Sequence, residues 1–277
     1  MLTQRELIGD HPKKAIFSKW LKCDDKPVTA TKNHRSLDPL IKTNDPELVE
    51  WLGKKIFDHH HSAYRIQKLK ENYAKLGYTL YAEQHRKLPQ ADKVKKGNCT
   101  EVLLTEYIQS CLDRQLIKVF KLRYNPNVDQ AIKGDDTLMV DVQNDGKSDK
   151  VRVYLGESKF RSTPTKKVVE TLAKSLSKDK KPLSYSFLVD DLGRSTDTLE
   201  LANLLDSFMI DEIKKKGDLI YAGFLLSDST TSAVTQTHLK CDNPHMVLIT
   251  VGLDDPEELV TEAFKYAENL VKNPTLV

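Results

Sequence analysis

Two strand-like segments joined by a tight turn constrain the fold of this chain more strongly than any other feature. Residues 137–142 and 151–160 carry the apolar and β-branched side chains that are typical of strands. The segment between them contains Asp145-Gly146, a pair that favours the tight turns of hairpins. We therefore expect these two segments to pair as an antiparallel hairpin.

The rest of the chain alternates between helical and strand-like patterns. Apolar residues recur three and four positions apart where a helix is expected, and they form short unbroken runs where a buried strand is expected. Expected helices cover residues 45–57, 64–76, 98–116, 166–176, 199–215 and 256–272, and expected strands cover residues 117–122, 218–226 and 245–252. This order predicts an α/β fold with a mixed central sheet flanked by helices.

Charge is distributed unevenly along the 277 residues, although the net charge is only +3. The first 96 residues contain 20 Lys and Arg against 12 Asp and Glu, whereas the remainder contains 23 against 28. Because a polar, Lys-rich stretch ends at Gly97, we expect a basic, mainly helical N-terminal region over residues 1–96 and a core over residues 97–277. The basic region indicates either a surface for a polyanion or an ordinary solvated face.

Several classes of protein and of site are not supported. The longest apolar runs, such as residues 219–226, are far shorter than the ~20 residues that cross a bilayer, so we expect a cytoplasmic protein that does not enter a membrane. The four cysteines form no CxxC pair and are expected to be free thiols. Neither GxGxxG nor GxxxxGK(S/T) occurs. We expect the run Asp58-His59-His60-His61 to lie on a helix surface, since consecutive helical residues point in different directions.

The strand at residues 151–160 ends in two charged side chains. Alternation places Glu157 and Lys159 on the same face as the apolar Val153 and Leu155. A charge on a buried face is costly unless it has a partner or a metal ion, so this pair is a candidate for chemistry. The alternative is that the strand leaves the core at Gly156, and that the two charges form a solvated pair worth under about 1 kcal/mol.

Two further acids precede or begin neighbouring elements. Asp136 stands directly before the first hairpin strand, where pairing of the strands would bring it close to Glu157, although Gly-Asp pairs commonly serve only as turns. Glu101 lies about one turn into the expected helix, and Asn98 with Glu101 also fits a capping box. Three acids and a lysine that meet at one sheet edge describe a divalent-metal phosphodiesterase site.

The order Glu101, Gly134-Asp135-Asp136 and Glu157-Ser158-Lys159 resembles the PD-(D/E)xK nuclease superfamily. The proline of that motif is absent, which leaves open whether Asp135 or Asp136 is the metal ligand; we favour Asp136 because it directly precedes the strand. The resemblance implies a restriction-endonuclease-like core over residues 97–277. It also implies Mg²⁺ or Mn²⁺ bound by Asp136, Glu157, Glu101 and the Ser158 carbonyl, with Lys159 orienting the attacking water.

More narrowly, residues 96–98, 134–138 and 155–161 resemble the HamA family, the nuclease subunits of Hachiman antiphage defence. This resemblance implies hydrolysis of DNA together with a HamB-type superfamily 2 helicase. Candidate phosphate contacts are Arg161, Lys166 and Lys167 beside the site and Arg65, Lys68, Lys70 and Lys75 in the basic region. Two alternatives remain: a catalytically inactive regulator of a helicase, and a stand-alone repair or restriction nuclease.

Overall fold

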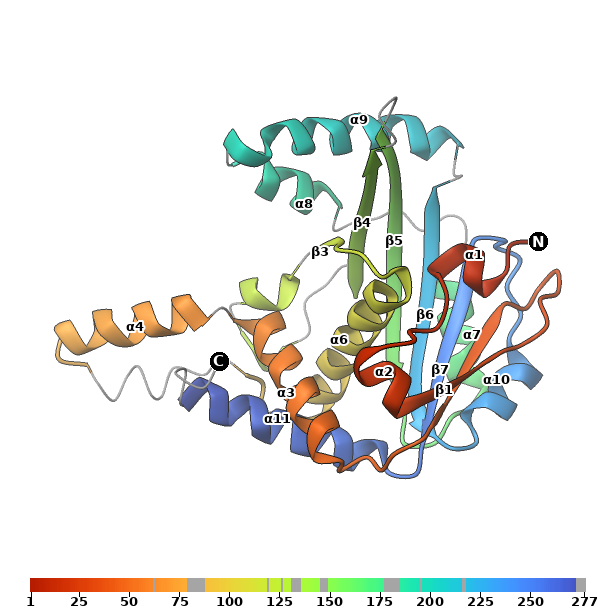
Figure 1. Ribbon diagram of the computed structural model, residues 1–277, viewed down its shortest axis with the longest axis horizontal. Helices are drawn as coiled ribbons and strands as arrows, with labels where there is room; N and C mark the ends of the chain where they lie inside the picture. Colours follow the sequence, from red (N-terminus) through yellow and green to blue (C-terminus); the bar gives the residue numbers. More distant parts are fainter. Residues whose placement is uncertain are drawn as a thin grey trace.

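The computed structural model describes residues 1–61, 63–78, 88–118, 120–125, 127–130, 136–144, 149–176, 185–194, 196–215 and 218–272. Within these residues a seven-stranded mixed sheet has the order β1-β2-β7-β6-β5-β4-β3 and is covered by helices (Figure 1). The strands are β1 (Leu21–Asp25), β2 (His34–Pro39), β3 (Ile117–Lys118), β4 (Thr137–Asn144), β5 (Asp149–Phe160), β6 (Leu219–Asp228) and β7 (Met246–Leu253). The predicted α/β fold with a mixed sheet flanked by helices is confirmed.

The centre of the sheet is parallel and its edges are antiparallel. Strands β2, β7, β6 and β5 pair as parallel neighbours. The antiparallel pairs are β1 with β2, β4 with β5, and β3 with β4. All of β7 and nearly all of β6 are buried. Their unbroken apolar sequences fit a strand that is covered on both faces.

Helices pack on the two faces of the sheet around two apolar clusters. One cluster joins α1, α2, α3, α6 and α11 to the sheet, and the other joins α7, α8 and α9 to the opposite face. The helices are α1 (Gln4–Ile8), α2 (Ala15–Trp20), α3 (Pro46–His60), α4 (Ala63–Lys75), α6 (Asp92–Leu112), α7 (Lys166–Ser175), α8 (Tyr185–Leu192), α9 (Leu199–Lys215), α10 (Thr231–His238) and α11 (Pro256–Lys272). None of these described helices is both long and apolar enough to span a membrane.

The expected hairpin is confirmed and brings α6 close to the sheet. Strands β4 and β5 pair from Thr137 opposite Gly156 to Asn144 opposite Asp149, while the turn at residues 145–148 lies outside the described residues. A side chain at Gly156 would lie 2.6 Å from Leu104 Cδ2 of α6. Glycine therefore permits the close approach of α6 to β5.

Helix α6 differs from the expectation at both ends. It begins at Asp92 instead of residue 98, and its N-cap is Ala91. The capping-box interpretation of Asn98 is therefore wrong: Asn98 is buried inside the helix and its amide contacts His60 Nε2 at 3.0 Å. The helix ends at Leu112, and the expected strand over residues 117–122 is reduced to β3, followed by a 3₁₀ turn at Lys121–Tyr124.

The N-terminal region is built into the same sheet and core. The division expected between residues 96 and 97 falls inside α6, and β1 and β2, which we did not expect, extend the sheet from β7. The expectation of a surface run at Asp58-His59-His60-His61 is wrong for His59 and His60, which are both buried. The four cysteines are free thiols, as predicted.

Candidate active site

A cavity of about 750 Å³ lies between the first half of α6 and the last residues of β5. Five residues singled out from the sequence line it: Glu101, Asp136, Ser158, Lys159 and Arg161. Helix α6 supplies Glu101, and Asp136 directly precedes β4. Strand β5 and the residue after it supply the other three. The hairpin and the packing of α6 against it therefore form this cavity.

Glu101 and Asp136 share one cationic partner. Lys121 Nζ lies 3.1 Å from Glu101 Oε2 and 3.7 Å from Asp136 Oδ1. The Glu101 and Asp136 side chains are only 15% and 19% exposed. The pKa of Glu101 is raised to about 8, mainly by burial and also by Asp136, while the ammonium of Lys121 lowers it. A cation beside these two poorly solvated acids therefore favours the ionised form of Glu101.

Asp136 is also bound to the backbone of β5. The Ser158 N–H donates to Asp136 Oδ2 at 2.8 Å. The Ser158 hydroxyl lies 3.0 Å from Thr100 Oγ1 of α6, and Thr105 of the same helix contacts Thr137 at 3.1 Å. These hydrogen bonds hold α6, β4 and β5 in one arrangement around the acids.

Glu157 and Lys159 bind each other. Lys159 Nζ donates to Glu157 Oε1 at 2.6 Å, and their side chains are 29% and 15% exposed for lysine and glutamate, respectively. The fully solvated pair that we considered from the sequence is therefore not formed. Thr137 pairs with Gly156. One step further in this antiparallel register, Asp136 lies opposite Glu157.

The donor chemistry of the cavity fits a hard divalent cation in part. Carboxylate oxygens are the ligands that Mg²⁺ prefers. Glu101 and Asp136 already lie close to one positive charge, the Lys121 ammonium. Among the described residues, no three His, Cys, Asp or Glu side chains gather closely enough to bind a metal ion. Asp135 lies outside the described residues, so the choice between Asp135 and Asp136 stays open. The ligand set of Asp136, Glu157, Glu101 and Ser158 therefore stays a prediction.

The candidate DNA contacts are spread over the molecule. Arg161 is exposed at the cavity, and Lys166 and Lys167 are exposed at the start of α7, where Lys166 lies 3.7 Å from Glu170. Lys68 and Lys70 lie on α4, which projects away from the sheet in Figure 1. Lys68 contacts Glu71 at 3.0 Å and Lys70 donates to the Lys272 carbonyl. Of these candidates, only Arg161 lines the cavity.

One residue of the site was missed from the sequence. Lys121 lies in the 3₁₀ turn after β3, inside a segment that we expected to be a strand. Its neighbours form no recognisable motif, and its position follows from the packing of the connector that carries it.

Comparisons with known proteins cover nearly the whole chain. The model of the HamA family matches residues 14–267, a range that includes every residue lining the cavity. The chain is 34% identical to the Hachiman protein HamA of Bacillus cereus over 274 residues, 97% of this chain and 97% of that relative. The chain therefore belongs to the HamA family of the Hachiman antiphage defence system.

Proposed function

We propose that this protein is the nuclease of its defence system and hydrolyses DNA phosphodiester bonds with a divalent metal ion. The observation that carries the proposal is the cavity in which Glu101 and Asp136 share the ammonium of Lys121 beside Ser158 and Lys159. Acids whose ionised form is favoured by a nearby cation, next to a lysine that can donate to a phosphate, are groups that metal-assisted hydrolysis uses.

The metal ion would be Mg²⁺, with Mn²⁺ as a substitute. Its proposed ligands are oxygens of Asp136, Glu157, Glu101 and the Ser158 carbonyl. When bound, the ion supplies positive charge that stabilises the phosphodiester transition state. Lys121 lies close to Glu101 and Asp136, so its ammonium would compete with a divalent cation for these two acids.

Lys159 is proposed as the group that contacts the reacting phosphate. Its ammonium lies at the cavity and is already held by Glu157. A lysine fixed in this way can donate hydrogen bonds to a non-bridging oxygen or orient the attacking water. Arg161 next to it, with Lys166 and Lys167, would bind flanking phosphates without reading the base sequence.

We propose a HamB-type superfamily 2 helicase as the partner that delivers DNA. Support comes from membership of the HamA family and from the excess of Lys and Arg in the first 96 residues. The alternative of a catalytically inactive regulator is less favoured, because Lys159, which binds Glu157, lines a cavity large enough for a nucleotide.

The test combines plasmid DNA, the helicase, ATP and Mg²⁺ with the wild-type chain, Glu157→Gln or Lys159→Met. We expect each variant to cleave at least about a hundredfold more slowly, the usual cost of losing one transition-state contact. Glu50→Gln and Lys54→Met serve as matched controls, since that ion pair is exposed on α3. Equal DNA loss in all reactions would remove the catalytic assignment, and DNA loss without the helicase would favour the stand-alone nuclease.

A further inference from the structure

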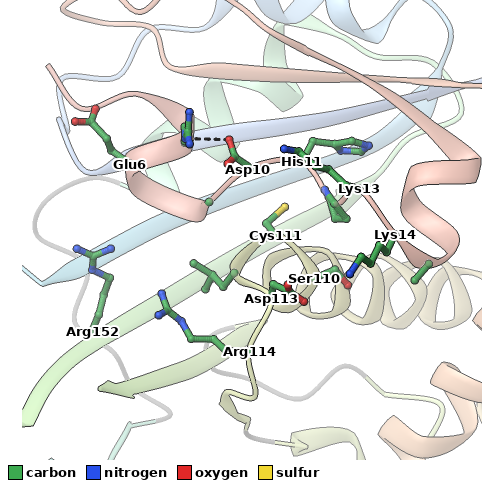
Figure 2. Close-up of a pocket in the computed structure, with 15 residues that line it drawn as sticks. Glu6, Asp10, His11, Lys13, Lys14, Ser110, Cys111, Asp113, Arg114 and Arg152 are labelled. Carbon is green, nitrogen blue, oxygen red and sulfur yellow. Dashed lines mark ion pairs between the residues drawn. The ribbon is translucent and has the colours of Figure 1, made fainter. Parts of the chain in front are cut away.

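A second cavity, of about 570 Å³, lies at the opposite end of α6. Its walls come from the segment joining α1 to α2, the C-terminal end of α6 and the first half of β5 (Figure 2). Cys111 lines it, ten residues after Glu101, which corresponds to about 15 Å along a helix. The second cavity is therefore separate from the proposed active site.

Cationic side chains are the most numerous charged groups in this cavity. They come from three segments that are distant in the sequence: Arg5, Lys13, Lys14, Arg114 and Arg152. Figure 2 shows Arg114 and Arg152 at one wall and Lys13 and Lys14 across from them. The fold thus gathers positive charge around a hollow large enough for a small ligand, since such sites usually measure about 300–1,000 Å³.

Part of the negative charge at the cavity is already paired with a cation. The Glu6 carboxylate accepts hydrogen bonds from the N–H and hydroxyl of Thr3, both at 2.8 Å, and so caps α1. Asp10 lies 3.0 Å from Arg5, the ion pair drawn as a dashed line in Figure 2. The hydrogen bonds from the neutral Thr3 leave the charge of Glu6 in place, so Glu6 and Asp113 remain as negative charges at the cavity.

Arg152 lacks the carboxylate that its position in the hairpin offers. It pairs with Asp141 across β4 and β5, but the Asp141 carboxylate instead lies 3.2 Å from Arg114 Nε and accepts from the Gln143 amide. Arg152 Nε is buried and has no hydrogen-bond acceptor among the described residues. This nitrogen is shielded from solvent, so a ligand would meet Arg152 at the part of its side chain that lines the cavity.

The remaining cations are also available. Lys13 and Lys14 are exposed at the rim, and neither forms an ion pair with a described residue. His11, in contrast, does not contribute charge: its ring nitrogens contact the Tyr107 hydroxyl and the Leu21 carbonyl at 3.0 Å each. Burial lowers the pKa of His11, which keeps the ring neutral near pH 7.

We propose that this cavity binds the phosphate group of a nucleotide-sized ligand. The forked guanidinium of Arg152 matches phosphate oxygens, and Lys13 and Lys14 offset the second charge that a terminal phosphate carries. The three positive charges of Lys13, Lys14 and Arg152 exceed the two negative charges of Glu6 and Asp113, which favours an anion such as phosphate. The ligand is either a free nucleotide or the 5′-phosphate end of a DNA fragment, and the site does not depend on the proposed nuclease reaction.

Calorimetry with the full chain tests this proposal without metal ions. The probes are inorganic phosphate, deoxyadenosine 5′-triphosphate, and one short single-stranded oligonucleotide with and without a 5′-phosphate. We expect the phosphorylated probes to bind, and Arg152→Gln to weaken their binding at least tenfold. Stronger binding of the triphosphate assigns the site to free nucleotides, whereas a preference for the 5′-phosphorylated oligonucleotide over its 5′-hydroxyl form assigns it to DNA ends.

A second variant guards against an effect of Arg152→Gln on folding. Lys13→Gln combined with Lys14→Gln changes only exposed side chains, and we expect it to weaken binding of the same probes at least tenfold. Lys54→Gln, an exposed lysine of α3, is the matched control and should bind as the wild type does. Absence of binding by every phosphorylated probe, or equal binding by all variants, would overturn the proposal.

Discussion

A buried glutamate in the middle of α6 offers the sharpest test of how the fold is stabilised. Glu106 Oε1 lies 2.7 Å from Lys118 Nζ and 2.9 Å from His59 Nε2, and Oε2 lies 3.0 Å from Lys55 Nζ. Burial alone would raise the pKa of Glu106, but the hydrogen bond from His59 and the two ammonium charges lower it well below its usual value. The carboxylate therefore joins α3, α6 and β3 as an ion.

The variant Glu106→Gln keeps the shape of this side chain and removes its charge. Lys118, only 11% exposed, then loses its counter-ion. Removing one partner of a buried ion pair costs about 3–5 kcal/mol. An unfolding entropy of about 2.1 cal/mol/K per residue over 277 residues converts a loss of about 3 kcal/mol into a melting temperature lower by about 5 °C.

Thermal and urea unfolding of the wild type, Glu106→Gln and Glu50→Gln at pH 7 measure this loss. Glu50 forms an exposed pair with Lys54 on α3, and such pairs contribute little, so its variant should melt with the wild type. Since the folded pKa of Glu106 lies below 4.5, its contribution is complete above pH 4.5 and declines as the pH falls below that value. Equal melting temperatures for the two variants would refute the reasoning.

Three further predictions use other parts of the molecule. Calorimetry should find that Lys121→Met binds Mn²⁺ about tenfold more tightly than the wild type, because the competing ammonium is gone. Unchanged affinity would contradict competition between Lys121 and the metal ion for the same acids. Urea unfolding should show that Gly156→Ala lowers the free energy of unfolding by about 1–3 kcal/mol, because its Cβ would lie 2.6 Å from Leu104 Cδ2. Gly97→Ala has open space around it and should raise the free energy of unfolding by about 1 kcal/mol. The reverse order of stability would exclude the packing argument. Burial lowers the pKa of His34 to about 4. The contribution of His34 to the free energy of unfolding should therefore fall by about 3 kcal/mol between pH 6.5 and pH 4, and His34→Gln should lose less stability than the wild type across that range.

The parts of the fold that were predicted from the sequence are those whose signal is local. The hairpin was predicted because alternation and Asp145-Gly146 act over a few residues, and its pairing is as expected. The strands near residues 218–226 and 245–252 were predicted because burial on both faces requires unbroken apolar runs, and β6 and β7 are such strands. The same local alternation placed Glu157 and Lys159 together.

The parts that were missed depend on contacts between distant segments. β2 carries polar residues, and it forms a strand because it pairs with β7, more than two hundred residues later. Its Arg35 is fully buried because Asp25 of β1 binds it at 2.6 Å. His59 is buried because Glu106 accepts a hydrogen bond from it. A polar residue with a distant partner gives no apolar pattern, so its burial cannot be recognised from neighbouring residues.

Lys121 belongs to this second class, and its position connects the buried glutamate to the candidate site. The connector that carries Lys121 is fixed on one side by Lys118 at Glu106 and on the other by Arg123, whose guanidinium donates to the Asp58 carbonyl at 2.6 Å. If Glu106 anchors this connector, then Glu106→Gln should also loosen Lys121 and change Mn²⁺ affinity, although Glu106 does not line the cavity. Mn²⁺ affinity that stays at the wild-type value while stability falls would show that the ion pair stabilises the fold without positioning Lys121.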